Sequence, residues 1–218
     1  MAFVAGIHST DTSAEDGAVY SFGGNHDGQL GLGDHKLKFQ FLPKLVTALH
    51  GHHVIQLASA GGHVLALTKD GKVFSWGRDA NGRLGLDDDE SVTLTPVNAV
   101  MPLSPQKAPN GSPKQTKSGN QFRPSLISAL QHVTVTQVTC GWNHSMCLTS
   151  AGEVYAWGNG SDGKLGLDDD QDRSTPYLVT LIDHKLVKID TFKFRYLTLR
   201  EKKYQFRVFP LATIIQVP

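Results

Sequence analysis

The sequence predicts an all-β protein built from repeated units, and three observations support this. A glycine, a short β-prone stretch and a second glycine occur three times along the 218 residues. A Gly-x-Leu-Gly-Leu turn follows each copy, and it starts eleven residues after the opening glycine. An internal period near 50 residues is typical of propellers and other repeat arrays. The copies are Gly17–Gly23, Gly71–Gly77 and Gly152–Gly158, and their turns are Gly28–Leu32, Gly82–Leu86 and Gly163–Leu167.

The spacing of the copies locates an insertion. The interval from Gly71 to Gly152 is half as long again as the interval from Gly17 to Gly71, which indicates that a segment was inserted between the second and third copies. The segment from about Met101 to Arg123 is rich in proline, serine, glycine and lysine, and it holds four basic residues and no acidic one. This composition predicts a mobile loop at 101–123.

Each copy predicts a strand, and a second strand precedes it. Phe74 and Trp76 alternate with small or aliphatic residues, which is the period of a strand. Residues 63–68 and 144–149 are two further candidate strands, each of which begins with a histidine. Short polar turns ending in Gly71 and Gly152 follow them, so each histidine strand and the next aromatic strand are predicted to form an antiparallel hairpin.

A third type of strand lies further upstream. Residues 54–58 and 135–139 are β-prone. Pro43 precedes the first of these segments and Pro124 precedes the second, at the same distance in each case. No long helix is predicted anywhere in the chain. Three strands in a constant order, the upstream strand, the histidine strand and the aromatic strand, are therefore predicted for each complete unit.

Composition sets only broad bounds on function. The chain is 39% hydrophobic and 19% charged, as is ordinary for a globular domain, and its net charge of +1 predicts no general attraction to nucleic acid or membranes. Cys140 and Cys147 are predicted to be buried thiols in a reducing compartment rather than a disulfide. The sequence predicts no membrane span and no secretory signal, so the expected location is the cytoplasm or the nucleus.

The order of these motifs resembles the regulator of chromosome condensation repeat family. The glycine-rich turn, the proline, the strand, the Gly-x-x-His strand and the Gly-x-Val-Tyr-x-Trp-Gly strand follow one another over roughly residues 5–189. The resemblance implies a seven-bladed β-propeller in which each repeat supplies a four-stranded blade. Three copies plus fragments imply a partial propeller of about three four-stranded blades over residues 1–190. We expect the copies near 17–70, 71–151 and 152–190, and Ala5–Ser9 resembles the end of an earlier copy.

The family pattern ends near residue 190. Leu186–Ile189 resembles the strand that precedes the next Gly-x-x-His, but neither that glycine nor that histidine follows. Residues 191–218 hold six basic residues and one acidic residue and are β-prone. This tail contacts nucleic acid or an acidic membrane, or replaces a strand pair and covers a blade edge, or is foreign to the family, and the sequence leaves these alternatives open.

Candidate chemistry is sparse. The sequence predicts no catalytic residue, cofactor or metal site, and His50, His52 and His53 lack nearby cysteine or carboxylate ligands. His63 and His144 occupy equivalent places, which favours hydrogen bonds to neighbouring strands over catalysis. Two acidic runs also occupy equivalent positions, and we predict that they lie on one rim and contact a basic partner. Their members are Asp87, Asp88, Asp89, Glu90, Asp168, Asp169 and Asp170.

The sequence therefore favours a noncatalytic β-propeller module that binds a protein partner. The resemblance also implies an alternative, a guanine-nucleotide exchange factor or regulator of a Ran-like small GTPase. Light sensing is a further class, although only Gly141–Ser145 is close to the motif of the plant ultraviolet-B receptor. A fourth hypothesis is that the chain is a fragment of a larger propeller-containing protein, such as a HECT-type ubiquitin ligase. Expected partners are a small GTPase or a basic protein, nucleic acid or chromatin, and a second copy that associates through open blade edges.

Overall fold

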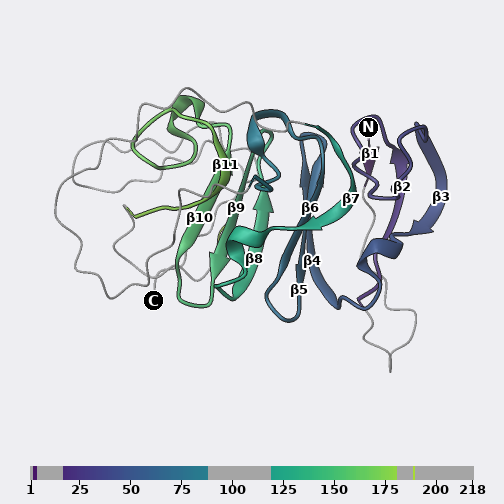
Figure 1. The fold of residues 1–218 in the computed structure, drawn as a ribbon, viewed down its shortest axis with the longest axis horizontal. Coiled ribbons are helices and arrows are strands. Elements are labelled where there is room, and N and C mark those ends of the chain that lie inside the picture. Colours follow the sequence, from purple (N-terminus) through teal and green to yellow (C-terminus); the bar gives the residue numbers. More distant parts are fainter. Residues whose placement is uncertain (1, 4–16, 88–118, 181–188, 190–218) are drawn as a thin grey trace.

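The computed structural model describes residues 2–3, 17–87, 119–180 and 189. These residues form three antiparallel sheets that stand side by side (Figure 1). The helical elements among them are four 3₁₀ turns of three residues each. The strands are β1 (Ala2–Phe3), β2 (Tyr20–Gly24), β3 (Phe39–Leu45), β4 (Val54–Ala60), β5 (His63–Thr68), β6 (Val73–Gly77), β7 (Gln121–Leu126), β8 (Val135–Cys140), β9 (His144–Thr149), β10 (Val154–Gly158) and β11 (Arg173–Leu178), and the 3₁₀ turns are η1 (Thr47–Leu49), η2 (Ala80–Gly82), η3 (Ser128–Leu130) and η4 (Ser161–Gly163).

Each sheet is a meander, and we call the sheets blades 1 to 3. Blade 1 contains β1, β2 and β3; blade 2 contains β4 to β7; and blade 3 contains β8 to β11. Within each blade, strands that follow one another in sequence are neighbours and run antiparallel. This row of blades fits the partial propeller predicted from the sequence.

The predicted hairpins are confirmed. His63 pairs with Gly77 between β5 and β6, and His144 pairs with Gly158 between β9 and β10. Gly71, which opens the second sequence copy, lies in the turn of the first of these hairpins. Each four-stranded blade therefore takes its first two strands from one sequence copy and its last two strands from the next.

The hydrophobic core lies between the blades. On β5, Val64 and Ala66 belong to a cluster shared with blade 1, whereas Leu65 and Leu67 belong to a cluster shared with blade 3. Successive residues of a strand point to opposite faces, so an interior blade is apolar on both faces. This arrangement explains why all six residues of β5 are buried.

The predicted C-terminal boundary of the mobile loop 101–123 is wrong. Gln121, Phe122 and Arg123 form the start of β7, which pairs with β6 from Gln121 opposite Gly77. The following Pro124 is tolerated because β7 is the last strand of its blade, where one missing N–H breaks no further ladder. The rest of the insert lies outside the described residues except for positions 119 and 120. Ala5–Ser9, Leu186–Lys188 and the tail 191–218 also lie outside them.

Other sequence expectations concern single features. Cys140 and Cys147 are both buried free thiols, and burial raises the pKa of each well above its usual range. Among the described residues, no helix is long and apolar enough to cross a membrane.

Candidate functional site

The glycine turn of each blade packs against the aromatic strand of the next blade. Trp76 of β6 donates its indole N–H to the carbonyl of Gln29 in the turn of blade 1, at 3.0 Å. The equivalent Trp157 of β10 lies over Gly85, where an added Cβ would come within 2.6 Å of its Nε1 atom. Gly85 also has a φ of +69°. Both features require glycine, and they explain why the turn motif accompanies the aromatic strand in sequence.

An exposed polar contact links blades 1 and 2. Asn120, just before β7, donates its side-chain amide to Asp27 Oδ1 of blade 1 at 3.1 Å. Its Oδ1 atom accepts a long hydrogen bond of 3.4 Å from the backbone N–H of Asp79 in its own blade. One side chain therefore joins the two blades at this point.

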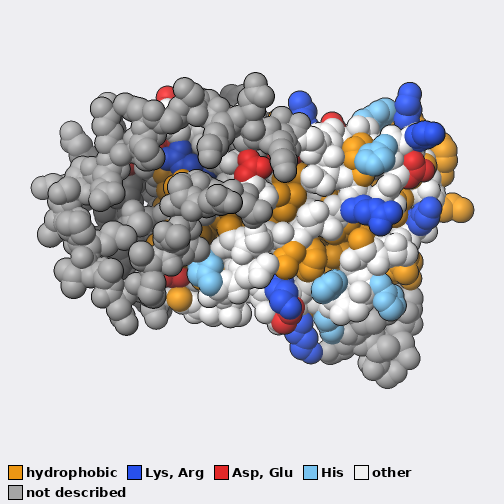
Figure 2. All heavy atoms as spheres, in the orientation of Figure 1, with side chains coloured by type: hydrophobic (Ala, Val, Ile, Leu, Met, Phe, Trp, Pro, Cys, Tyr) orange, Lys and Arg blue, Asp and Glu red, His pale blue; other side chains and the backbone are white. Residues whose placement is uncertain are grey.

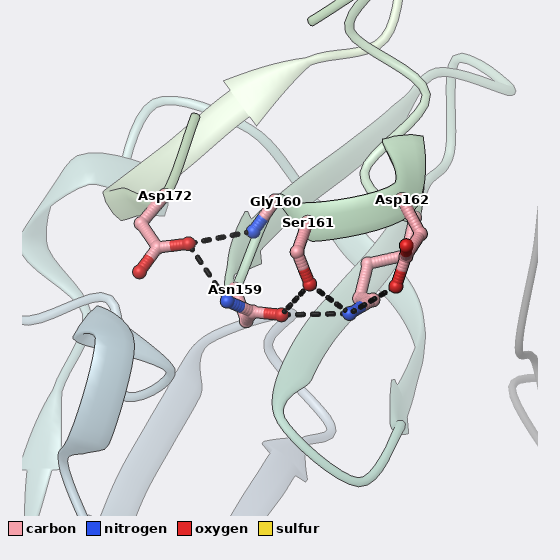
Figure 3. Close-up of polar contacts among 6 residues, drawn as sticks. Asn159, Gly160, Ser161, Asp162 and Asp172 are labelled. Atoms are coloured by element: carbon pink, nitrogen blue, oxygen red, sulfur yellow. Dashed lines mark hydrogen bonds and ion pairs between the residues drawn. The ribbon is translucent and has the colours of Figure 1, made fainter. Parts of the chain in front are cut away.

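The junction between blades 2 and 3 contains the same contact with the groups exchanged. Asp172, just before β11, accepts from the side-chain amide of Asn81 in blade 2 at 2.8 Å. Its other oxygen accepts from the backbone N–H of Gly160 and from Asn159 Nδ2, each at 2.9 Å (Figure 3). Asn81 directly precedes the glycine turn of its copy, as Asp27 does in the copy before. The two residues thus hold the same place in the repeat, so the junction preserves one donor and one acceptor.

A buried hydrogen-bond chain also links blades 2 and 3. Ser145 donates its hydroxyl proton to the carbonyl of Arg83 at 2.7 Å and lies 2.9 Å from His63 Nε2. Because its single proton goes to Arg83, the hydroxyl accepts from His63, which must carry its proton on Nε2. The prediction that His63 ties neighbouring strands is confirmed, and the strand that it reaches belongs to the next blade.

His63 and Ser145 do not have the properties of a catalytic pair. Both are fully buried, and burial together with the charge of Arg83 lowers the pKa of His63 to about 3. A general base works best with a pKa near the operating pH, and a nucleophilic hydroxyl must reach substrate. The pair therefore has a structural role.

His144 does not form the corresponding bond. Its Nε2 atom is buried and has no hydrogen-bond partner within the described part of the chain. The prediction that this histidine bonds to a neighbouring strand is therefore wrong for that atom. Burial, followed by the charges of Lys164 and Arg83, lowers the pKa of His144 to about 4, so the ring is neutral near pH 7.

Arg83 is the polar centre of the second junction, and sequence reasoning missed it. It is 2% exposed, and its Nη1 atom donates to the carbonyls of Gly61 and Trp142 at 3.1 Å. Its Nε atom donates to Ala80 at 2.6 Å. Burial lowers the pKa of the guanidinium. Its hydrogen bonds to backbone carbonyls compensate for the free-energy cost of burying the charge. The Trp142 side chain is 76% exposed, so blade 2 holds only its backbone.

Glutamine side chains join the first strands of successive blades. Gln56 of β4 accepts from the backbone N–H of Val138 and donates to its carbonyl, both at 3.0 Å. Gln137 of β8 forms the same pair of bonds with Ile189, at 2.8 and 2.5 Å. Ile189 therefore stands beside blade 3 where Val138 stands beside blade 2.

The acidic residues after the third glycine turn have unequal surroundings. Asp169 pairs with Arg173 at 2.5 Å, whereas Asp168 and Asp170 are exposed. In the same region, Lys164 bonds to Asn159 at 2.7 Å and lies 3.7 Å from the exposed Asp162 (Figure 3). The charge of Asp169 is thus largely neutralised, whereas Asp162, Asp168, Asp170 and Asp172 are exposed.

The first acidic run is only partly described. Asp87 is half-buried, and Asp88, Asp89 and Glu90 lie outside the described residues. The described part of the chain contains no group of three or more histidine, cysteine or carboxylate side chains that could hold a metal ion.

Comparison with known proteins identifies the family. The regulator of chromosome condensation (RCC1) repeat matches residues 16–67, 70–112, 110–148 and 151–191. The chain belongs to the RCC1 repeat family. A second description of the same repeat matches residues 54–83 and 135–164.

Curated relatives are much longer than this chain. A bifunctional serine/threonine-protein kinase/NEDD4-like E3 ubiquitin-protein ligase of Dictyostelium discoideum is 34% identical over 191 residues, which are 87% of this chain and 9% of that protein. The ultraviolet-B receptor UVR8 of Arabidopsis thaliana is 35% identical over 173 residues, 79% of this chain and 32% of the receptor. The human probable E3 ubiquitin-protein ligase HERC6 is 30% identical over 201 residues, 80% of this chain and 20% of the ligase. This RCC1-repeat chain thus corresponds to a minor part of each relative.

Solved structures show the same fold. Yeast RCC1 (Prp20) in its crystal structure with Kap60 has a TM-score of 0.63 and 21% identity, over 81% of this chain and 36% of that one. Prp20p from Saccharomyces cerevisiae, described with its binding to Gsp1p and histones, has a TM-score of 0.61 and 22% identity, over 79% and 37% of the two chains. These similarities confirm a partial propeller of the RCC1 type.

Proposed function

We propose that this chain is a noncatalytic protein-interaction module that presents its acidic loops to a basic protein partner. The observation that carries the proposal is the contrast between its buried and its exposed groups. Buried His63, Ser145 and Arg83 are engaged in contacts between blades, whereas Asp168 and Asp170 are exposed on one loop. Exposed charges of one sign steer and select partners of the opposite sign.

A basic partner is consistent with the relatives. One structural neighbour is described with its binding to histones, which are strongly basic proteins. The acidic surface here extends from Asp162 through Asp168 to Asp170 and lies at the glycine turn, where the propeller loops are. Expected contacts of the tail 191–218 with nucleic acid, and a location in the cytoplasm or the nucleus, remain predictions.

The proposal is tested by the binding of a lysine- and arginine-rich peptide with the composition of a histone tail. Fluorescence anisotropy should show binding that weakens as salt is added, because screening reduces attraction between exposed charges. A variant with Asp168→Asn and Asp170→Asn should bind about threefold or more weakly. Asp70→Asn is the matched control, since Asp70 is also an exposed carboxylate but lies in the β5–β6 turn, where it pairs with Lys72.

Equal affinity of the double variant and the wild-type chain would contradict the role of these aspartates. Loss of binding in the Asp70→Asn control would show that net charge, and not the position of the loop, determines the affinity.

A further inference from the structure

The last strand of blade 1 carries an exposed apolar strip. Phe39 is 52% exposed, Phe41 88% and Leu42 73%, and Phe39 and Phe41 stack on each other. Exposed lysines lie on both sides of this strip in sequence, at Lys38 and Lys44. Figure 2 shows hydrophobic side chains among Lys and Arg side chains at the β3 end of the molecule. Exposed large apolar side chains that gather on one strand mark a candidate interaction surface.

The equivalent positions in blade 2 contact the preceding blade, with Phe122 half-buried and Arg123 still exposed. Phe122 of β7, which corresponds to Phe41, has its carbonyl bonded to the N–H of Gly33 in blade 1 at 2.7 Å. The ring of His35 lies 4.4 Å from the ring of Phe122. Arg123, which corresponds to Leu42, packs against Gly33. The exposed strip on β3 thus corresponds to the surface that the glycine turn of a preceding blade contacts.

A matching turn is present on blade 3. Asp162 corresponds to Asp27 and Asn81, each of which bonds to the residue just before the last strand of the following blade. Asp168 corresponds to Gly33 and has the same left-handed backbone, with φ of +63° compared with +78°. Asp162 and Asp168 are both exposed. This turn is acidic, whereas the strip on β3 is flanked by lysines, so the two surfaces are complementary in charge.

The first strand of each blade provides a second observation on the surfaces of blade 3 and blade 1. Blades 2 and 3 begin with β4 and β8, but blade 1 has no counterpart of these strands among its described residues. Ile189 stands in the place of such a first strand, held by Gln137 of blade 3. Ile189 thus lies beside blade 3 at the position that Val138 of β8 occupies beside blade 2.

We propose that a second copy of this chain docks head to tail, with the glycine turn of blade 3 seated on β3 of the next copy. Phe41 then takes the place of Phe122, and Asp162 and Asp168 face the lysine-flanked strip. Such an interface joins two different surfaces, so copies close into a ring or extend as a chain. This inference goes beyond the proposed function, since a monomer would still present its acidic loops.

The test is the mass of the whole chain in solution over a range of micromolar concentrations. Light scattering or sedimentation should give a mass that rises with concentration above the 23.7 kDa of one chain. Phe41→Asp should hold the mass near that of a monomer, with an unchanged circular dichroism spectrum because Phe41 is on the surface. Trp142→Asp, at another exposed aromatic residue, is the control and should behave like the wild-type chain.

A mixing experiment tests the two-surface geometry. Phe41→Asp disables the β3 surface, and a variant with Asp162→Lys and Asp168→Lys disables the turn. Each variant alone should stay monomeric, whereas their mixture should form a dimer and nothing larger, because one functional surface of each kind remains. A wild-type chain that is monomeric at every concentration, or a Phe41→Asp variant that still associates, would overturn the proposal. The peptide assay on Phe41→Asp separates this failure from failure of the proposed function, since that variant keeps Asp168 and Asp170.

Discussion

Asn81 donates its side-chain amide to the carboxylate of Asp172 across the junction between blades 2 and 3, at a distance of 2.8 Å. The preceding junction has the reverse pairing, in which Asp27 is the acceptor and Asn120 the donor. The repeat therefore fixes a complementary pair of side chains at this position rather than one residue type.

This relationship predicts a compensating pair of substitutions. Asn81→Asp should destabilise the protein by about 1 kcal/mol because it places two carboxylates together, and adding Asp172→Asn should restore most of that loss. The double variant reproduces the Asp27–Asn120 arrangement. Urea unfolding of the two single variants and the double variant gives the coupling free energy. Additive effects would contradict a direct contact between these residues.

Ser145→Ala should destabilise the protein by about 1–3 kcal/mol, because it leaves the N–H of His63 and the carbonyl of Arg83 unpaired in the interior. Ser75→Ala is the matched control, since Ser75 also donates to a carbonyl, that of Leu84, at 2.7 Å. Its cost should be smaller, because only one group loses its partner. Denaturant midpoints compare the two variants, and an equal cost would argue against the linked chain.

Asp79→Asn should stabilise the protein at neutral pH. Asp79 is 8% exposed, and burial raises its pKa from 3.8 to about 6, so the folded chain holds this proton more tightly than the unfolded chain and stability is lost as the pH rises through the folded pKa. Asn25 holds the equivalent place in blade 1 and accepts from the N–H of Leu30 at 3.0 Å, so an amide suits this site. We expect a gain of about 1–3 kcal/mol near pH 8 and little gain near pH 4. Asp34→Asn, at an exposed carboxylate, should be neutral at both pH values.

Acid should weaken the fold through its buried histidines. The pKa values of His63 and His144, about 3 and about 4 in the folded chain, lie below the ordinary value of 6.5. The contribution of the two neutral histidines to the free energy of unfolding is complete above pH 6.5. It is lost as the pH falls toward the folded pKa values, because the unfolded chain binds protons at a higher pH than the folded chain does. Each histidine should remove about 2 kcal/mol between about pH 7.5 and pH 5, partly offset by Asp79. His63→Gln keeps a donor without titrating, so its stability should fall less over this range, as urea unfolding at each pH would show.

Gly85→Ala should cost about 2–4 kcal/mol, because its Cβ would meet Trp157 at 2.6 Å and its φ is +69°. Gly51→Ala is the matched control, since Gly51 has a φ of +82° and open space around it. The difference between the two variants in thermal unfolding isolates the contribution of the contact with the tryptophan. Equal losses would mean that backbone strain alone accounts for the effect.

Local patterns in the sequence predicted the hairpins well. β5 and β9 have the predicted bounds, residues 63–68 and 144–149, because a histidine, an apolar run and a glycine turn define each hairpin within a short window. The start of β7 was missed, since Gln121–Arg123 continue the polar composition of the insert and become a strand only by pairing with β6.

The contacts between blades could not be predicted from the sequence. Asn120 and Asp27 are 93 residues apart, and Asn81 and Asp172 are 91 apart, with exchanged residue types that hide the equivalence. The acidic run was found, but the sequence did not show that Asp169 is neutralised by Arg173. The sequence does not distinguish the strip on β3 either, because Phe41 and its half-buried equivalent Phe122 are the same residue type, and the contact with a preceding blade makes the difference.

The placement of each sequence copy across two blades has a consequence for how such proteins change in length. The central hairpin turns of blades 2 and 3 are closed by the same backbone hydrogen bond. The N–H of Thr68 donates to the carbonyl of Lys72, and the N–H of Thr149 donates to the carbonyl of Glu153. Removal of residues 71–151 would therefore join β5 to β10 through an equivalent hairpin and leave no half-built sheet. Recombination between copies could shorten or lengthen the row by whole blades, with the new joint always inside a tight turn.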